Sequence, residues 1–292
     1  MWRYFLEKLE KKKSINGLFL FFSSAILLIL TLQLVDFFIN LFFGFENGNI
    51  QEKNNTIFSF LFFLITFIPI FLCVDFYRSK LDISRKKIVK LFTIAILVTI
   101  LNSFFIKSSL NILIQILIID FGCLYFVFII SKIYSNNKFR WLGLKQISNS
   151  DVKYFFYYFL AWPPIIIWGT IINYYDLEFF NSDYSKTIIE SLNNNLIIIF
   201  FLACIVAPIC EEIIFRGFVY KLINSKYTIK HAIIINSILF GIIHFDPSAI
   251  IPATILGLSL SIIRYKTKSV ISTVIMHSLH NIFALIMTTQ AL

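Results

Sequence analysis

The stretch LIIIFFLACIVAPIC, residues 196–210, carries no charged side chain, and EEIIFR, residues 211–216, follows it directly. Such an apolar run is typical of a membrane helix, in which an ionised group costs about 2.5–3.5 kcal/mol on insertion scales. Two adjacent carboxylates and a guanidinium are retained there if they pair, line a wet cavity or take part in a reaction. The apolar runs that follow contain three histidines, His244, His277 and His280, which favours a reaction.

The composition indicates an integral membrane protein. The chain has 292 residues, of which 58% are hydrophobic and 14% are charged, and its mean hydropathy is +0.82. A soluble domain is about 45–50% apolar and about 25% charged. The net charge is +10, but the Lys and Arg residues fall between apolar runs, as the positive-inside rule produces. We therefore interpret the charge as membrane topology and expect no nucleic-acid partner.

The apolar runs predict the fold class. A spanning helix needs about 20 apolar residues, and runs near that length lie at 17–43, 57–77, 88–106, 110–133, 154–174, 190–223 and 269–287. Two shorter runs, 232–245 and 249–263, predict a tilted span, a buried half-helix or a re-entrant piece. We therefore expect an all-α fold, a polytopic integral membrane helical bundle of eight or nine segments, some of them short or kinked.

Prolines interrupt two of these runs. Pro163-Pro164 must kink or break the run around them, because proline removes a backbone donor and clashes with the preceding turn. Pro208 lies three residues before Glu211 and is expected to bend the helix that carries it. Such a bend frees backbone carbonyls, which need protein or water partners inside a membrane.

The distribution of basic residues predicts the topology. Lys and Arg concentrate in the N-terminal stretch and in the predicted loops 78–90, 132–153 and 264–268, while the alternate loops contain few. This alternation predicts a multi-pass protein with a cytoplasmic N-terminus, and we expect it in a bacterial plasma membrane. Residues 1–150 form an N-terminal membrane region of about four spans, and residues 151–292 form a second membrane domain that contains all the candidate chemistry.

The spacing within EEIIFR separates the two carboxylates. Adjacent helical residues point about 100° apart, so Glu211 and Glu212 face different surroundings. Glu212 and Arg216 are at i,i+4, the spacing of a helical ion pair, which leaves Glu211 free to face a cavity. The alternative is a packing device or a helix-end cluster at the cytoplasmic surface, and the sequence does not choose between a surface position and mid-depth.

The histidines add a second set of candidates. Asn236, Phe240 and His244 form one helical stripe, and the small residues Ser237 and Gly241 lie beside it, which suits close helix approach. Alone, His244 would be interpreted as a hydrogen-bonded core residue. His277 and Asn281 are at i,i+4 and share a face, and His280 is expected to flank it. Two donors on one face could bind an oxyanion, and a His pair could bind a metal.

Taken together, the three motifs resemble the CPBP family, the Abi or type II CAAX-protease intramembrane peptidases. The family pattern is EExxxR, FxxxH, and HxxxN or HxxxB, each on its own membrane helix. Here the pattern is met by Glu211-Glu212-x-x-x-Arg216, Phe240-x-x-x-His244 and His277-x-x-x-Asn281, in a signature that covers about residues 195–287. Residues 1–150 lie outside the signature.

The resemblance implies an intramembrane endopeptidase that cleaves a membrane-associated or C-terminal peptide. It implies catalytic roles for Glu211 and His244, which would share and activate a water molecule, and for His277 and Asn281, which would stabilise the oxyanion. Glu212, Arg216 and Phe240 would support them. We expect no required cofactor. Zinc is the alternative, since Glu211, His244 and His277 could serve as its three protein ligands.

Two other functions compete with hydrolysis. The Abi side of the family suggests a non-catalytic membrane immunity or scaffold protein. Intramembrane ionisable residues also mark transporters and ion paths, and Asp36, Asp75 and Asp120 are further carboxylates in or near spans, which we interpret as helix-end or packing residues. The expected partners are the lipid bilayer and a membrane-associated peptide or protein substrate.

Overall fold

The computed structural model describes residues 2–43, 50–105, 110–175, 177, 195–244 and 246–290. These residues form helices and connecting turns, and none of them lies in a strand. The all-α prediction is therefore confirmed. The chain divides into two compact units, residues 1–130 and 131–292, and the functional motifs all lie in the second.

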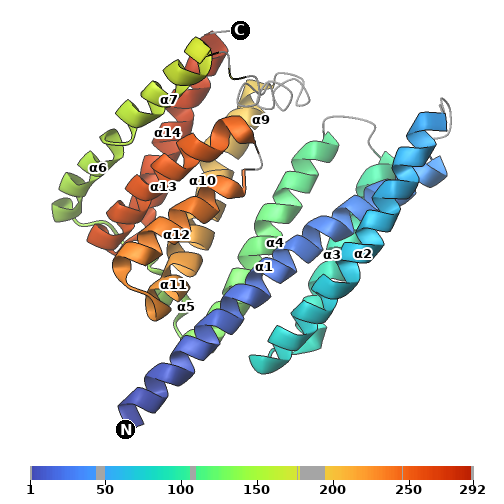
Figure 1. The fold of residues 1–292 in the computed structure, drawn as a ribbon, viewed down its shortest axis with the longest axis horizontal. Coiled ribbons are helices and arrows are strands. Elements are labelled where there is room, and N and C mark those ends of the chain that lie inside the picture. The colour runs from blue at the N-terminus through green and yellow to red at the C-terminus, as the bar shows by residue number, and fades with distance from the viewer. Residues whose placement is uncertain are drawn as a thin grey trace. The chain divides into compact units, whose positions relative to one another are not determined.

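The first unit contains the four longest helices before the motifs (Figure 1). Helix α1 (Trp2–Phe43) packs against α2 (Ile50–Lys80) and α3 (Arg85–Phe105), and α4 (Leu110–Tyr134) follows. The predicted loop 78–90 is shorter than expected, because α2 continues to Lys80 and α3 begins at Arg85. Asp75 closes this turn: its Oδ1 lies 2.6 Å from Arg78 Nη2 and 3.0 Å from Arg85 Nε.

The second unit begins with short helices that end at the predicted proline break. Helix α5 (Lys138–Leu142) is followed by a 3₁₀ segment, η1 (Asn149–Phe155), and by α6 (Phe156–Phe159). The chain then breaks, and α7 (Trp162–Tyr175) starts immediately before Pro163-Pro164, so both prolines lie in its first turn. A first turn tolerates proline because its N–H groups have no intrahelical partner.

One continuous helical segment, residues 196–226, carries EEIIFR. It consists of α9 (Leu196–Phe200), η3 (Phe201–Val206), α10 (Ala207–Glu212), η4 (Ile213–Val219) and α11 (Tyr220–Lys226). Both η3 and η4 are π-helical. A π-turn inserts an extra residue and is frequent at functional sites. The α-helical pitch assumed in the sequence analysis therefore applies to the short α10 and fails on both sides of it.

Helices α12 (Ile229–Ile242), α13 (Pro247–Thr267) and α14 (Val270–Gln290) complete this unit, and α12 packs against α13. A Cβ built on Gly241 would lie 2.5 Å from the Ile250 carbonyl oxygen, and one on Gly257 would lie 3.2 Å from Ser237 Cα. The predicted close approach along the Ser237/Gly241 stripe is thus confirmed. The predicted loop 264–268 is wrong, since α13 continues to Thr267 and the turn is only Lys268 and Ser269.

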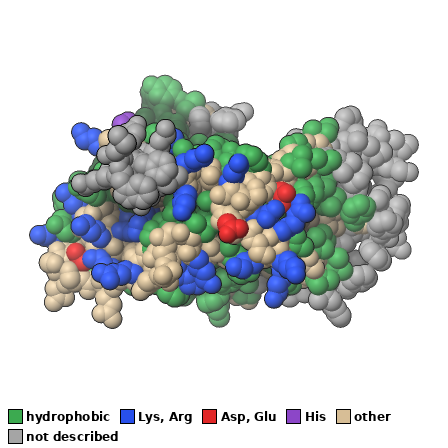
Figure 2. All heavy atoms as spheres, turned by 90° about the horizontal axis from the view of Figure 1, so that it is seen from below, with side chains coloured by type: hydrophobic (Ala, Val, Ile, Leu, Met, Phe, Trp, Pro, Cys, Tyr) green, Lys and Arg blue, Asp and Glu red, His purple; other side chains and the backbone are tan. Residues whose placement is uncertain are grey.

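Six described helical segments are long and apolar enough to cross a membrane, and α12 is shorter. The 249–263 run, which sequence length placed below the threshold, lies within one of the six, Pro247–Thr267. Lys and Arg side chains gather on the face drawn in Figure 2, with few acidic ones among them. This is a polytopic helical membrane bundle, and the side on which its N-terminus lies stays a prediction.

Candidate active site

The Glu212–Arg216 ion pair predicted from the sequence is present. Arg216 Nη1 donates to Glu212 Oε1 at 2.8 Å, and both side chains are fully buried. The pair forms across the start of η4. Removing one member of such a pair leaves an uncompensated buried charge, which is far more costly than losing a surface contact.

Helices α12 and α13 enclose the rest of the Arg216 guanidinium. Its Nη2 donates to the Gly257 carbonyl at 3.2 Å, and its Cζ lies 4.1 Å from the centre of the Phe240 ring, a cation–π contact. A side chain at position 257 would press on that ring, because a Cβ there would lie 3.2 Å from Phe240 Cδ1. The absence of a side chain at Gly257 lets α13 approach both the cation and Phe240.

His277 lies between the two carboxylates. Its Nδ1 is 3.0 Å from Glu212 Oε1, and its Nε2 is 3.8 Å from Glu211 Oε2. An ionised carboxylate only accepts hydrogen bonds, so the Nδ1–H donates to Glu212 and the Nε2 edge is turned toward Glu211. A separation of 3.8 Å is too long for a direct hydrogen bond. His277 is therefore oriented by its hydrogen bond to Glu212, while its Nε2 edge faces Glu211 without bonding to it.

Glu211 differs from its neighbour as the helical offset predicted. Its side chain is 22% exposed, whereas that of Glu212 is 0% exposed. The Glu211 Oε2 atom is nevertheless buried and makes no hydrogen bond within the described residues. A buried polar atom without a partner is unusual and calls for a water molecule, an ion or a reacting group. Glu212 Oε2 likewise has no partner among the described residues, so it is the exposed fraction of Glu211 that makes this carboxylate accessible to a ligand.

Phe240 lies between the two candidate imidazoles. Its ring centre is 5.1 Å from that of His244 and 5.6 Å from that of His277, both in edge-on arrangements. His244 Nδ1 lies 2.8 Å from the Phe240 carbonyl oxygen, which can only accept, so Nδ1 carries the hydrogen and Nε2 is left with a free lone pair. No hydrogen bond joins His244 to Glu211 directly among the residues described.

Asn281 has a partner that the sequence did not identify. Its Nδ2 donates to the Ala203 carbonyl at 2.7 Å. Within η3 the Ala207 N–H binds the Leu202 carbonyl, five residues back, so the corresponding donor for Ala203 would be residue 208. Residue 208 is a proline and has no N–H. Asn281 therefore satisfies a carbonyl that Pro208 leaves free, and its second N–H remains for another acceptor.

The remaining histidines lie away from this cluster. His280 was expected to flank the His277/Asn281 face, but its Nδ1 is 3.3 Å from Tyr158 Oη, and its ring centre is 5.3 Å from that of Trp162. It thus faces α6 and α7. His231 is exposed and contacts Thr228, with Oγ1 and Nδ1 2.7 Å apart. The three-residue offset from His277 turns His280 to another neighbour.

Sequence reasoning missed Arg264. Its side chain is buried in α13, where Nε donates to the Arg216 carbonyl at 3.0 Å and Nη2 to the Leu142 carbonyl at 3.3 Å. The residue was assigned to a basic loop because Lys266 and Lys268 follow it. The sequence did contain an indication that Arg264 belongs to the helix, because it follows the apolar run 249–263 directly.

The candidate zinc ligands do not gather into a ligand set. Among the described residues, no three His, Cys, Asp or Glu side chains come close enough together to hold a metal ion. The histidines alone would be compatible with a metal, because Nδ1 of His277 donates to Glu212, Nδ1 of His244 donates to a main-chain carbonyl, and Nε2 of each points elsewhere. As placed, however, the described side chains do not form a three-ligand catalytic zinc site.

The similarity to known proteins falls on the part of the chain that contains the three motifs. Residues 193–283 match the family described as Type II CAAX prenyl endopeptidase Rce1-like, so the resemblance predicted from the three motifs is confirmed. YdiL of Bacillus subtilis (strain 168), whose name describes it as a candidate membrane peptidase, is 33% identical over 30% of this chain and 35% of its own. The UPF0177 protein YxdF of Lactococcus lactis subsp. lactis (strain IL1403) is 32% identical over 27% of this chain and 44% of its own.

These matches are partial. The chain spans less than half the length of either curated relative. No solved structure matches it significantly. The first unit, residues 1–130, lies outside the family match.

Proposed function

We propose that this protein is an intramembrane endopeptidase that hydrolyses a peptide bond in a membrane-associated or C-terminal peptide. The observation that carries the proposal is the partly exposed Glu211 side chain, whose buried Oε2 atom has no hydrogen-bond partner among the described residues and faces His277 Nε2 at 3.8 Å. A carboxylate with a free oxygen can accept a proton from a water molecule. Peptide hydrolysis needs such a base beside a water molecule.

In the proposed reaction, each catalytic residue has a separate role. Glu211 takes a proton from a water molecule that His244 Nε2 helps to hold, and the water oxygen attacks the carbonyl carbon of the peptide bond. The resulting oxyanion accepts hydrogen bonds from the free N–H of Asn281 and from His277 Nε2–H. The C–N bond then breaks, and Glu211 returns the proton to the departing amine nitrogen. The proton that Glu211 takes from water thus ends on the amine product.

The supporting residues hold the reacting ones in place. Glu212 accepts from His277 Nδ1 and fixes the direction of its Nε2 edge, and Arg216 keeps Glu212 ionised. Phe240 separates the two imidazoles and covers the guanidinium. This arrangement orients the donors before the substrate arrives, which is how fixed dipoles lower a reaction barrier.

The proposed reaction requires no metal. Asn281 is a poor zinc ligand and a good hydrogen-bond donor, and in the proposed reaction His244 Nε2 holds the water molecule while His277 Nε2 binds the oxyanion. We expect hydrolysis to continue at an unchanged rate after dialysis against a zinc chelator. Loss of activity on chelation, and its return with zinc, would replace this mechanism with a metal-dependent one.

The test is cleavage by the full chain in proteoliposomes. The probe is an internally quenched peptide that ends in a prenylated CAAX sequence, the class named in the matched family description. Loss of a general base lowers rates by about 10²–10⁴-fold, so Glu211→Gln is expected to fall by at least about 100-fold. His244→Gln is compared with His231→Gln, the exposed histidine outside the cluster.

Cellular substrates provide the second measurement. New peptide termini in the membrane fraction are compared between cells that express the wild type and cells that express Glu211→Gln at equal levels. Termini that require Glu211 support the peptidase and identify its substrate. If neither the probe nor any membrane protein is cut, while the Glu211→Gln protein retains full biological effect, the protein acts by binding, as the immunity or scaffold hypothesis holds.

A further inference from the structure

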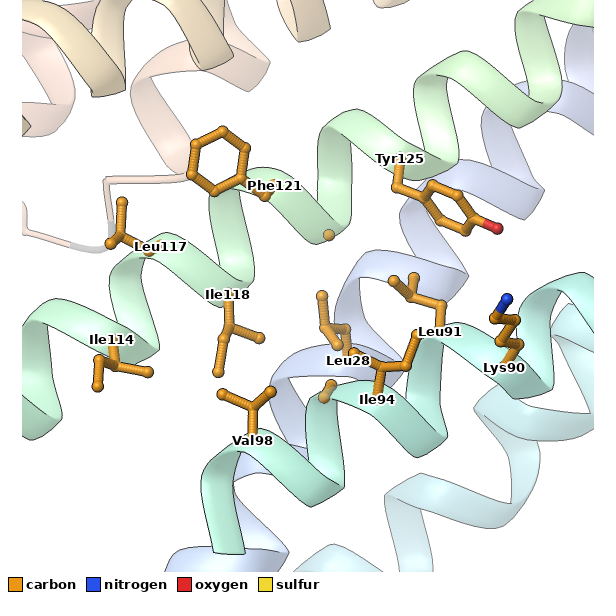
Figure 3. Close-up of a pocket in the computed structure, with 12 residues that line it drawn as sticks. Leu28, Lys90, Leu91, Ile94, Val98, Ile114, Leu117, Ile118, Phe121 and Tyr125 are labelled. Atoms are coloured by element: carbon orange, nitrogen blue, oxygen red, sulfur yellow. The ribbon is translucent and has the colours of Figure 1, made fainter. Parts of the chain in front are cut away.

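The first unit contains a cavity of about 590 Å³ between α3 and α4. Its walls are apolar for most of their length, with Ile94 and Val98 contributed by α3 and Ile118, which points toward Val98, contributed by α4 (Figure 3). Leu28 of α1 forms the floor. Its volume lies within the range of about 300–1,000 Å³ that is typical of small-molecule sites.

The cavity follows the helices lengthwise. On α4 its lining residues run from Ile114 to Tyr125 at helical spacing, and on α3 they run from Lys90 to Val98. At a rise of 1.5 Å per residue, the α3 side alone is about 12 Å long. The space is thus a groove that suits a chain and not a compact ring. Ile94 is 47% exposed and Phe121 is 55% exposed, so apolar surface remains uncovered along it.

Polar groups occur at one end of the groove. Lys90 and Tyr125 both line the groove and lie toward that end in Figure 3, while Ile114 and Val98 lie toward the other. Lys90 is exposed, and Lys86 and Lys87 lie about one turn before it on the same helix. A cationic end beside a tyrosine is the pattern of a helix at the level of lipid headgroups, where Lys snorkels and Tyr prefers the interface.

We propose that this groove binds one anionic phospholipid, with an acyl chain along the apolar walls and the phosphate at Lys90. The apolar length accommodates the chain through van der Waals packing, because lipid tails are as apolar as the groove walls and no hydrophobic driving force operates between them. The positive charge selects the headgroup, because Lys residues near the surface attract anionic lipids. The groove is lined entirely by residues of the first unit, so the proposal is independent of the peptidase site.

The test is lipid retention by the delipidated full chain in detergent, measured by native mass spectrometry. The probes are phosphatidylglycerol and phosphatidylcholine with identical acyl chains. We expect one phosphatidylglycerol adduct that persists at the lowest lipid concentration, with phosphatidylcholine binding several-fold more weakly. Lys90→Gln is expected to weaken the phosphatidylglycerol adduct about fivefold, as loss of one membrane-facing basic charge implies, and to leave phosphatidylcholine unchanged.

Two matched pairs complete the design. Lys87→Gln removes a charge from the same helix outside the groove lining and should retain the adduct. Ile118→Trp fills the groove and should abolish it, whereas Leu97→Trp, at an exposed α3 position outside the lining, should not. The proposal is overturned if the two lipids bind equally, if Lys87→Gln matches Lys90→Gln, or if Ile118→Trp keeps the adduct. Should Ile118→Trp fail to fold, the two lysine variants still decide.

Discussion

Substitution of Asn281 distinguishes a catalytic role of this residue from a positioning role. Its amide donates to the Ala203 carbonyl at 2.7 Å, and Pro208 deprives that carbonyl of a main-chain donor within the π-helical turn. The perturbation is Asn281→Leu, which keeps the size of the side chain and removes the donor. The carbonyl then has no protein partner that replaces the amide, in a segment where water is scarce.

The expected cost follows from the contact that is lost. Leaving a buried acceptor unsatisfied costs about 1–3 kcal/mol, but hydrogen bonds between membrane helices average about 0.6 kcal/mol and reach about 1.7 kcal/mol in double-mutant cycles. Ala203 and Asn281 are only partly buried, so about 1 kcal/mol is the reasonable expectation. The assay is reversible unfolding of the purified protein in mixed micelles of increasing SDS content.

Pro208→Ala supplies the control within the same chain. Alanine restores an N–H at residue 208, which can bind the Ala203 carbonyl in a π-turn, and an α-turn would bring in the Ala207 N–H instead. In the Pro208→Ala background, Asn281→Leu should therefore cost much less than in the wild type. Equal costs in both backgrounds would refute the reasoning, since independent sites are additive.

Activity measured on the same four proteins separates the two roles. If Asn281 acts only by satisfying Ala203, the double variant recovers both stability and cleavage. If its second N–H also stabilises the oxyanion, the double variant recovers stability but remains slow by about 10²-fold or more, the usual cost of one oxyanion donor. The proposed mechanism requires the second result.

Three further predictions concern the surroundings of the site. Arg216→Leu leaves Glu212 as an uncompensated buried charge and should lower the free energy of unfolding by about 3–5 kcal/mol, measured in the same SDS titration. Gly241→Ala should cost about 1–3 kcal/mol by overpacking against Ile250 and Thr254, whereas Gly169→Ala, with nothing within 4 Å of its Cβ, should cost nothing or stabilise. Arg264→Met should lower cleavage and stability together, because the Arg216 and Leu142 carbonyls lose their donor, while Lys266→Met should leave both unchanged.

The sequence was sufficient for those features that follow from local spacing. The different exposure of Glu211 and the break before Pro163 are consequences of helical pitch and of the proline ring. The Glu212–Arg216 pair was also predicted from its spacing, and it forms although Arg216 lies in the π-helical η4. The apolar runs predicted the fold class for the same reason, because a membrane helix must be continuously apolar over its length. In each case, residues within about one turn of each other determine the outcome.

Features that depend on contacts between helices were not accessible in this way. The direction of His280 toward Tyr158 and Trp162 is set by the packing of α14 against α6 and α7, which no spacing within α14 encodes. The same holds for the engagement of Arg216 with Gly257 and of Arg264 with the Arg216 carbonyl. These bonds join residues 41 and 48 positions apart, and their partners are main-chain groups that carry no sequence signature.

The two π-helical turns connect the local and the long-range parts of the site. Pro208 makes a main-chain carbonyl in η3 unavailable to its own helix, and Asn281 of α14 binds that carbonyl. One turn further along α10, Glu212 binds His277 of the same α14 face. Both of these contacts of α14 thus depend on the π-helical segments η3 and η4, which flank the six-residue helix α10. A segment straightened into a regular α-helix would keep the EEIIFR spacing but would shift Ala203 relative to Glu212, so His277 and Asn281 could no longer reach both partners at once. The proline that disturbs the helix is therefore part of the geometry that fixes Asn281 at Ala203 while His277 lies between Glu212 and Glu211.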